Sequence, residues 1–71
     1  MPKLYSSYHI IRILLQHGFE EVSQKGSHIK LRKSGNPTLT TIVPADRKEI
    51  PIGTFRSICR QSNLQPTDFE R

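Results

Sequence analysis

His28 stands among lysines in the segment 24–31, which reads Gln-Lys-Gly-Ser-His-Ile-Lys-Leu. Glycine supplies the positive φ that a two-residue hairpin turn needs, and serine can hydrogen-bond its own backbone there. The pair Gly26-Ser27 therefore predicts a tight turn between two strands, with Lys25 before it and His28 after it. This gives the histidine a fixed place on a strand, and an imidazole is a side chain that can transfer protons near neutral pH.

The chemistry that suits this group of residues is phosphodiester cleavage in RNA, with the neighbouring 2′-hydroxyl as nucleophile. Such an enzyme needs a base for the 2′-proton, an acid for the leaving 5′-oxygen and positive charge for the phosphorane. His28 can take either proton role, and three cations can bind the phosphate: Lys25, Lys30 and Arg32. No metal is required. The same residues also suit an ordinary solvated strand face, so by themselves they leave catalysis by His28 open.

Other chemistries fit the sequence poorly. The three histidines are widely spaced and there is no cysteine pair, so no zinc-ligand spacing is present, and we expect neither a metal nor a cofactor. Cys59 falls on the apolar stripe of a predicted helix, which indicates a buried core thiol. Ser27 and His28 are adjacent on a strand and point to opposite faces, which argues against a Ser-His-Asp triad with Asp46.

Length and charge restrict the function further. The 71 residues predict one domain, 1–71, with a thin core and no deep cavity. Eleven Lys and Arg oppose six Asp and Glu, and a net charge of +5 favours a polyanion partner, most often nucleic acid. There is no apolar run of ~20 residues and no signal peptide, so we expect no membrane association and a cytoplasmic location.

The elements that must position His28 follow from periodicity and from capping signals. We expect a helix from Ser6 or Ser7 to about His17, three strands, a second helix after Pro51 and a last helical turn beginning at Pro66. The predicted strands are 20–25, 28–32 and 39–43. This order predicts an α+β fold, a two-layer sandwich of order α-β-β-β-α in which helices cover one face of a three-stranded antiparallel sheet.

The expected faces of these elements decide which side chains are free to act. Strand alternation turns Ile29 and Leu31 toward the core, and it turns the functional residues outward: His28, Lys30 and Arg32. The first helix is expected to bury one stripe of apolar residues, with two more at its edges: Ile11, Leu14 and Leu15, then Tyr8 and Ile10. His9 and His17 are expected to be surface residues.

The chain resembles the HicA toxins, the small ribonucleases of HicA–HicB toxin–antitoxin pairs. The resemblance covers nearly the whole chain and is most specific in the element Gly26-Ser27-His28. It also includes the following segments: Gly18-Phe19, Gln24-Lys25, Ile29 to Arg32, Thr41 to Pro44, Gly53 to Ile58, Arg60-Gln61 and Phe69.

The resemblance implies a fold like the double-stranded RNA-binding domain. It also implies metal-independent cleavage of messenger RNA and neutralisation by a HicB-type antitoxin. The catalytic histidine of the family falls on His28, and the glycine and serine before it fall on Gly26 and Ser27, which we group with the RNA-binding residues. Many members have a second histidine shortly after the proline that ends the third strand, whereas here Pro44 is followed by Ala45, Asp46 and Arg47. A second proton-transfer group would then have to be water, a lysine or Asp46.

Two other functions use the same surface. A non-catalytic RNA-binding module would bind duplex shape and phosphates through the basic sheet face without cleaving RNA. A pure protein-interaction subunit would use that face to dock an acidic partner. Three observations distinguish these functions. A ribonuclease cleaves RNA, and a binding module binds RNA in a salt-sensitive way without cleaving it. A protein-interaction subunit forms a salt-insensitive complex and has no affinity for RNA.

Overall fold

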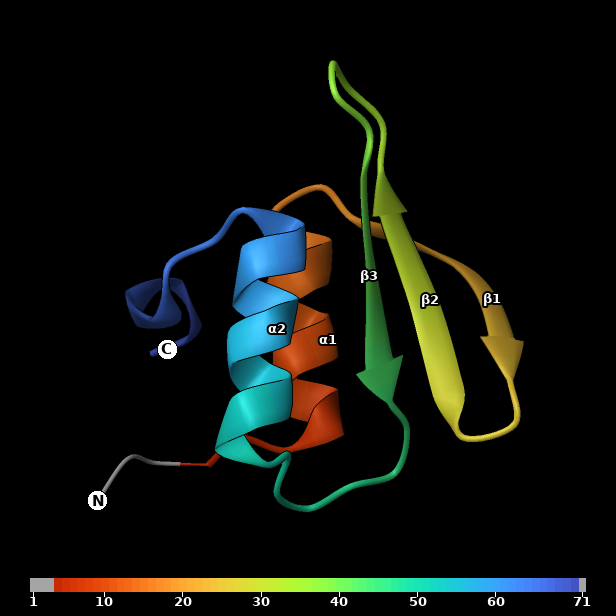
Figure 1. Ribbon diagram of the computed structural model, residues 1–71. Helices are drawn as coiled ribbons and strands as arrows, with labels where there is room; N and C mark the ends of the chain where they lie inside the picture. Colours follow the sequence, from red (N-terminus) through yellow and green to blue (C-terminus); the bar gives the residue numbers. More distant parts are fainter. Residues whose placement is uncertain (1–3, 71) are drawn as a thin grey trace.

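A computed structural model describes residues 4–70, so the ends of the predicted domain, residues 1–3 and 71, lie outside the described residues. The elements along the chain are α1 (Ser7–Gln16), β1 (Glu20–Lys25), β2 (His28–Lys33), β3 (Leu39–Pro44), α2 (Ile52–Ser62) and the 3-10 helix η1 (Pro66–Phe69). The strands form an antiparallel sheet of order β1-β2-β3, and α1 and α2 lie side by side over one face of it (Figure 1). The predicted α+β sandwich is confirmed, and its layering is compatible with a double-stranded RNA-binding-domain-like fold.

The core lies between the two helices and the inner face of β2 and β3. Eight apolar side chains in it are at most 1% exposed: Ile10, Ile13, Leu14, Leu31, Val43, Ile50, Ile58 and Phe69. The ring of Phe69 from η1 meets the edge of Phe55 from α2, with 5.1 Å between the ring centroids. The last helical turn therefore completes the core, as Pro66 and Phe69 predicted.

β1 contributes little to this core. All six of its residues are exposed, because it is an edge strand and the helices pack mainly over the other end of the sheet. Its pairing with β2 shifts between Glu21 and Ser23, so Val22 is an irregular position and remains 43% exposed. Its one strong apolar residue therefore does not anchor the strand.

The buried face of α1 differs from the predicted one. The residues that it buries are Ser7, Ile10, Ile13 and Leu14, whereas Leu15 is 48% and Tyr8 77% exposed. Apolar residues surround much of this short helix, so several stripes fit a helical period and only the position of the sheet selects one. The other apolar residues therefore lie on the outer side of α1: Tyr8 and Leu15, with half-buried Ile11 beside them.

The ends of the helices follow the capping signals. Ser6 is the N-cap of α1 and its hydroxyl accepts a hydrogen bond from the His9 amide at 3.1 Å. Gly18 follows α1 with a φ of 94°, and Asn63 ends α2 in the left-handed region with a φ of 61°. Phe19 then packs back into the core at 2% exposure, as expected of an anchor.

Candidate RNA-cleaving site

The turn that carries His28 is the predicted two-residue hairpin. β1 ends at Lys25, β2 begins at His28, and these two residues are paired. Gly26 has a φ of 60°, while Ser27 is not in the left-handed region, which is the pattern of a turn with glycine at its first central position. The Ser27 carbonyl accepts a hydrogen bond from the Ala45 amide at 2.7 Å, so the turn is also fixed to the chain that follows β3.

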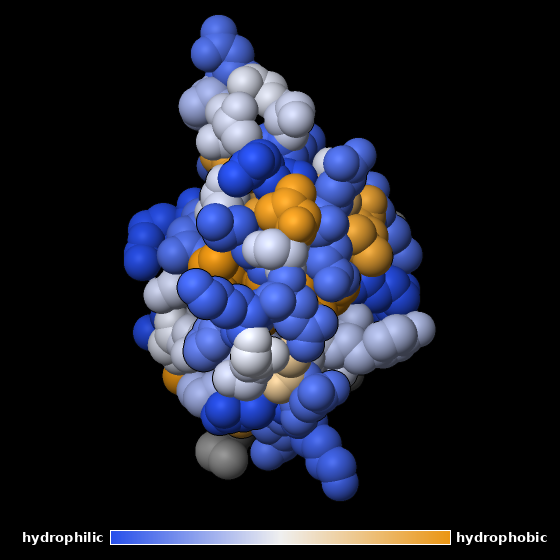
Figure 2. Space-filling model, turned by 90° about the vertical axis from the view of Figure 1, so that its right-hand side faces the viewer, coloured by the Kyte–Doolittle hydropathy of each residue, from blue (hydrophilic) through white to orange (hydrophobic). Residues whose placement is uncertain are grey.

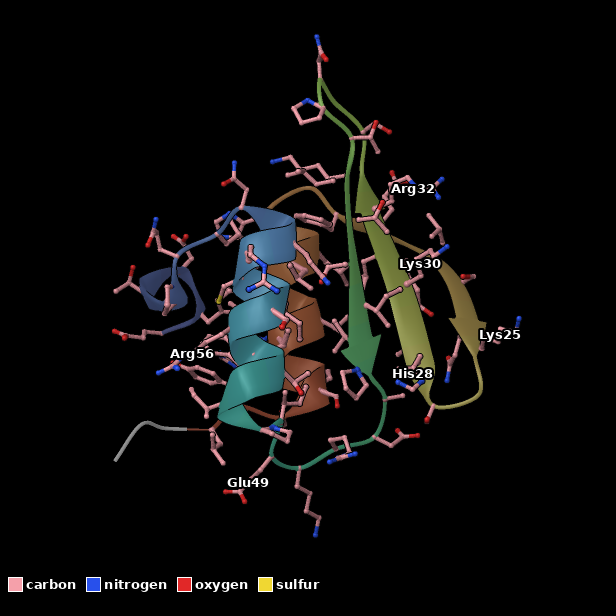
Figure 3. The ribbon with its side chains drawn as sticks, in the orientation of Figure 1. Lys25, His28, Lys30, Arg32, Glu49 and Arg56 are labelled. Atoms are coloured by element: carbon pink, nitrogen blue, oxygen red, sulfur yellow. The ribbon has the colours of Figure 1, made fainter. Side chains whose placement is uncertain are left out.

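The open face of the sheet carries the predicted site residues in a defined register. His28 and Arg32 are exposed, Lys30 is half-buried by its neighbours, and Ile29 and Leu31 are buried on the other side. The predicted alternation of β2 is therefore confirmed. Figure 3 shows Lys30 and Arg32 following His28 along β2, with Lys25 on β1 beside the same end.

Cross-strand pairing divides the cations into two groups. Lys25 is directly opposite His28, whereas Arg32 is opposite Glu20. Directly opposite residues lie on the same face of an antiparallel sheet, with Cβ atoms ~5 Å apart. The charge of Arg32 is thus partly balanced by a carboxylate, and the uncompensated positive charge lies at the His28 end, on Lys25 and Lys30.

The surroundings of this face are open and mostly polar. Figure 2 views the molecule from the side of the open sheet face and shows a largely hydrophilic surface with isolated hydrophobic side chains. On β3, Pro44 is opposite His28 and Ile42, 37% exposed, is opposite Lys30. The face is therefore a shallow platform with apolar spots beside the cations, which suits an extended ligand more than an enclosed small molecule.

The ring of His28 makes no hydrogen bond within residues 4–70. His9 differs, because its Nε2 lies 2.6 Å from the Phe69 carbonyl and its Nδ1 lies 3.2 Å from the Arg12 guanidinium. The carbonyl can only accept and the guanidinium can only donate, so these two contacts suit the His9 tautomer that carries its hydrogen on Nε2. His9 is half-buried, so the prediction of a surface residue is only partly correct; its partner Phe69 is 60 residues away and left no local signal in the sequence.

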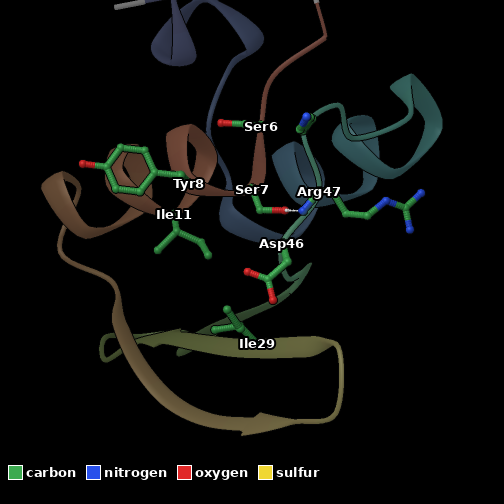
Figure 4. Close-up of a pocket in the computed structure, with 8 residues that line it drawn as sticks. Ser6, Ser7, Tyr8, Ile11, Ile29, Asp46 and Arg47 are labelled. Atoms are coloured by element: carbon green, nitrogen blue, oxygen red, sulfur yellow. Dashed lines mark hydrogen bonds between the residues drawn. The ribbon is translucent and has the colours of Figure 1, made fainter.

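No second histidine lies on the described sheet beside His28, and Asp46 lines a pocket on the other side of that sheet. Asp46 lines a pocket together with Ile29, whose side chain lies on the helix side of the sheet, opposite to His28. Ser7 holds this segment in place. Its hydroxyl donates to the Pro44 carbonyl at 2.5 Å. It also accepts a hydrogen bond from the Arg47 amide at 3.0 Å (Figure 4). Sequence reasoning considered Ser7 only as a cap, since the partners of this clamp are far away in the chain.

The burial of Cys59 fits the expectation from sequence. Cys59 is 7% exposed, and burial, with a smaller contribution from the charge of Asp68, raises the pKa of its thiol. This makes it a poor nucleophile. Among the described residues there is no group of three or more His, Cys, Asp or Glu side chains that could hold a metal ion. No helix of the described chain is long and apolar enough to cross a membrane.

Comparison with known proteins identifies the family. The family model of the HicA toxin of bacterial toxin–antitoxin systems matches residues 8–64, which is most of the chain. The chain therefore belongs to the HicA toxin family. No curated protein matches it.

Proposed function

We propose that this chain is the toxin of a type II toxin–antitoxin pair, a single-domain endoribonuclease that cleaves cytoplasmic mRNA without a metal. One observation carries the proposal: an exposed imidazole without a hydrogen-bond partner in the described chain stands directly opposite a lysine on a basic sheet face. A core histidine would have fixed partners, as His9 has. His28 instead has both ring nitrogens available to a ligand.

In the proposed reaction His28, as a neutral imidazole, accepts the proton of the ribose 2′-hydroxyl. The 2′-oxygen forms a bond to phosphorus, the bond from phosphorus to the 5′-oxygen breaks, and Lys25 donates the proton that this oxygen takes up. The products are a 2′,3′-cyclic phosphate and a free 5′-hydroxyl. Lys30 stabilises the charge of the phosphorane, and a proton-transfer group of this kind contributes roughly 10²–10⁴-fold in rate.

The remaining predicted residues act in binding. Gly26 and Ser27 keep the turn low beside His28, so that a phosphate can approach, and Arg32 contacts the RNA backbone farther along β2. Arg56 takes no part in this scheme, because it lies on α2, on the side of the molecule away from the open sheet face (Figure 3).

The chemistry of the product ends tests this mechanism. An oligoribonucleotide should yield 2′,3′-cyclic phosphate and 5′-hydroxyl ends, and replacement of the one 2′-hydroxyl next to the cleaved bond by hydrogen should abolish cleavage there. Cleavage that persists at a 2′-deoxy position, or that yields 3′-hydroxyl and 5′-phosphate ends, would refute the 2′-hydroxyl mechanism.

A non-catalytic RNA-binding module is the second candidate. The observation in its favour is that His28 is the one imidazole on the open face of the described sheet, while Asp46 faces the helix side. In that case highly purified protein, free of antitoxin, would bind RNA with strongly salt-dependent affinity and leave it intact after long incubation.

We further propose that a HicB-type antitoxin inhibits the toxin by covering His28 and its cations. A partner that covers an open basic face needs an acidic surface. In the complex, amide hydrogen exchange should slow at the start of β2 and in the Gly26-Ser27 turn. A complex that leaves His28 open to solvent would argue against this mechanism.

A further inference from the structure

A second feature lies at the same end of the sheet as His28, on the helix side. The first turn of α1, the start of β2 and the loop after β3 enclose a pocket of about 460 Å³ (Figure 4). This volume falls in the range of ~300–1,000 Å³ typical of small-ligand sites. This volume exceeds that of a single nucleobase, and the proposed cleavage mechanism gives no role to the residues that line the pocket.

The pocket combines an apolar floor with an exposed aromatic ring. Ile11, half-buried, and Ile29, 8% exposed, contribute aliphatic surface, and Tyr8 lines the outer side at 77% exposure. An aromatic ring this exposed contributes little to the core. Flat aliphatic surface and a tyrosine ring are what an unstacked base requires to leave water, because every base has a π face.

Asp46 places a carboxylate in this pocket. Its backbone has a φ of 55°, a conformation uncommon for residues other than glycine, and its side chain makes no hydrogen bond or ion pair within the described chain. Figure 4 shows the carboxylate turned toward Ile29. The Ser7 clamp on Pro44 and Arg47 fixes the loop on both sides of Asp46, so the backbone that carries the carboxylate is in place before any ligand binds.

The donor pattern of the bases selects the ligand. A carboxylate has two acceptor oxygens and, when ionised, no donor. On its Watson–Crick edge guanine presents two adjacent donors, N1–H and the 2-amino group. Adenine, cytosine and uracil each place an acceptor beside their donor, which would face a carboxylate oxygen. A bidentate, charge-assisted pair is therefore available to guanine alone among the four bases.

The charge and the location of the pocket both fit RNA. Arg47 and Lys48 follow Asp46 on the rim, and neither makes an ion pair in the described part of the chain, so both can meet a phosphate. Ile29 in the floor is the residue after His28, and Pro44, the cross-strand partner of His28, comes two residues before Asp46. The pocket and the proposed catalytic group thus lie on opposite faces of one strand, at the end closed by the Gly26-Ser27 turn.

We propose that this pocket binds a guanine base of the RNA substrate, next to the bond that His28 cleaves, with Asp46 reading the base edge and Tyr8 supporting its face. The inference rests on the proposed ribonuclease function. An RNA strand that leaves the open sheet face over the Gly26-Ser27 turn places one nucleotide in the pocket. The pocket thereby gives the toxin a base preference.

Binding is tested first without cleavage. ¹⁵N-labelled His28→Ala protein is titrated with hexauridylates carrying one guanosine, one adenosine or one cytidine, and chemical shifts are followed by NMR. We expect the guanosine oligomer to bind at least about tenfold more tightly, since a hydrogen bond to a charged group accounts for a factor of this order. Shifts should centre on Tyr8, Ile29 and Asp46. Equal affinity for the three oligomers would overturn the proposal.

Two pairs of variants separate base reading from charge and folding. Asp46→Asn should remove the guanosine preference, and asparagine tolerates positive φ, so the loop should keep its shape. Glu49→Gln changes the charge equally, on the same loop and outside the pocket, and should leave the preference intact. Tyr8→Leu should weaken binding about fivefold or more, and Tyr8→Phe should not. An Asp46→Asn protein that still prefers guanosine would refute the assignment.

Cleavage mapping then separates this inference from the proposed function. With active protein, cleavage of mixed oligomers should occur at one fixed step from guanosine. Asp46→Asn should still cleave the oligomers but at positions unrelated to guanosine.

The contrary outcomes distinguish the two proposals. Cleavage that depends on His28 but has no relation to guanosine would overturn the pocket assignment and would not affect the proposed ribonuclease function. Guanosine-selective binding without any cleavage would support the pocket and refute the proposed function. Tight binding of free guanosine 5′-monophosphate, with no guanosine preference in oligomers, would overturn the substrate role.

Discussion

His28 and His9 show two different uses of the same side chain. Three contacts hold the ring of His9 in place. Its Nε2 lies 2.6 Å from the Phe69 carbonyl oxygen, and its Nδ1 lies 3.2 Å from the Arg12 guanidinium. The ring also stacks on Tyr5, with the ring centroids 4.8 Å apart. His28 is exposed and has no such partner among the described residues. The first arrangement stabilises a fold, and the second leaves an imidazole available for proton transfer.

Opposite effects of two histidine substitutions follow from this contrast. His9→Ala should lower the free energy of unfolding by about 1–2 kcal/mol, because it leaves the Phe69 carbonyl without its donor and removes ring stacking. His28→Ala should change it by less than about 0.5 kcal/mol, since the residue is exposed. Urea denaturation of both variants measures the two values. A larger loss of stability in His28→Ala would mean that the residue has a structural role.

The cations of the open face should contribute unequally to the reaction. Lys25 is opposite His28, whereas Arg32 is opposite Glu20. We expect Lys25→Ala to lower kcat/KM for an oligoribonucleotide by about tenfold or more, mainly through kcat, because it removes charge and a proton donor at the reacting phosphate. Arg32→Ala should cost less and act through KM. The reverse order of the two effects would contradict the assigned roles.

At the scale of elements, the site depends on one turn and one clamp. The Gly26-Ser27 turn is fixed to the chain after β3 by the hydrogen bond from Ala45. Ser7 of α1 binds the backbone of Pro44 and Arg47, on either side of that residue. Ser7 is 4% exposed, and both hydrogen bonds of its hydroxyl are partly buried. The position of His28 thus depends on contacts that link α1, β2 and β3.

Ser7→Ala should therefore be destabilising well beyond the loss of one surface hydroxyl. It leaves the Pro44 carbonyl and the Arg47 amide without their partner, at a cost of about 1–3 kcal/mol. Ser6→Ala, which removes only the cap of α1, should cost about 1 kcal/mol. Thermal unfolding compares the two, and a smaller effect of Ser7→Ala than of Ser6→Ala would contradict the clamp.

Two glycine substitutions test the hairpin. Neither Gly26 nor Gly53 has an atom within 4 Å of an added Cβ, but Gly26 has a φ of 60° and Gly53 does not have a positive φ. Gly26→Ala should thus cost about 1–2 kcal/mol from backbone strain alone, and Gly53→Ala in α2 should be neutral or slightly stabilising. Equal stability of the two proteins would show that the turn does not need its left-handed residue.

The sequence predicted the elements better than it predicted their surroundings. Alternation in β2 is local, so Ile29, Leu31 and His28 were placed on the correct faces. The face of α1 depends on where the sheet lies, and this is why Leu15 was expected inside and Ile13 was overlooked. The pocket and the roles of Ser7 and Asp46 arise from contacts between residues about 20 to 40 positions apart, which periodicity does not detect.

At the scale of the whole molecule, charge and shape agree with an RNA substrate. The net charge is +5, and the described sheet leaves one face uncovered, with Lys30 and Arg32 on the strand that carries His28 and Lys25 opposite that residue. The core is small and needs η1 to close it, since Phe69 is fully buried against Phe55. The helix-covered face of the sheet forms the core, and the uncovered face is accessible to an RNA ligand.

RNA affinity should accordingly depend on salt. If Lys25, Lys30 and Arg32 each neutralise one phosphate of a single strand, the logarithm of the binding constant should fall with the logarithm of salt concentration with a slope of roughly −2. Fluorescence anisotropy of labelled RNA with the His28→Ala protein gives this slope without cleavage. An affinity that does not change with salt would point to a protein partner for this face.

The central claim is that His28 transfers the proton in a metal-independent cleavage of RNA. The most direct measurement is cleavage of an oligoribonucleotide by purified wild-type and His28→Ala proteins, both in excess chelator and both shown to be folded. We predict that wild-type protein cleaves RNA in the chelator and that His28→Ala does not, with a loss of at least about 10²-fold. Cleavage by His28→Ala at the wild-type rate, or loss of wild-type activity in the chelator, would contradict the claim.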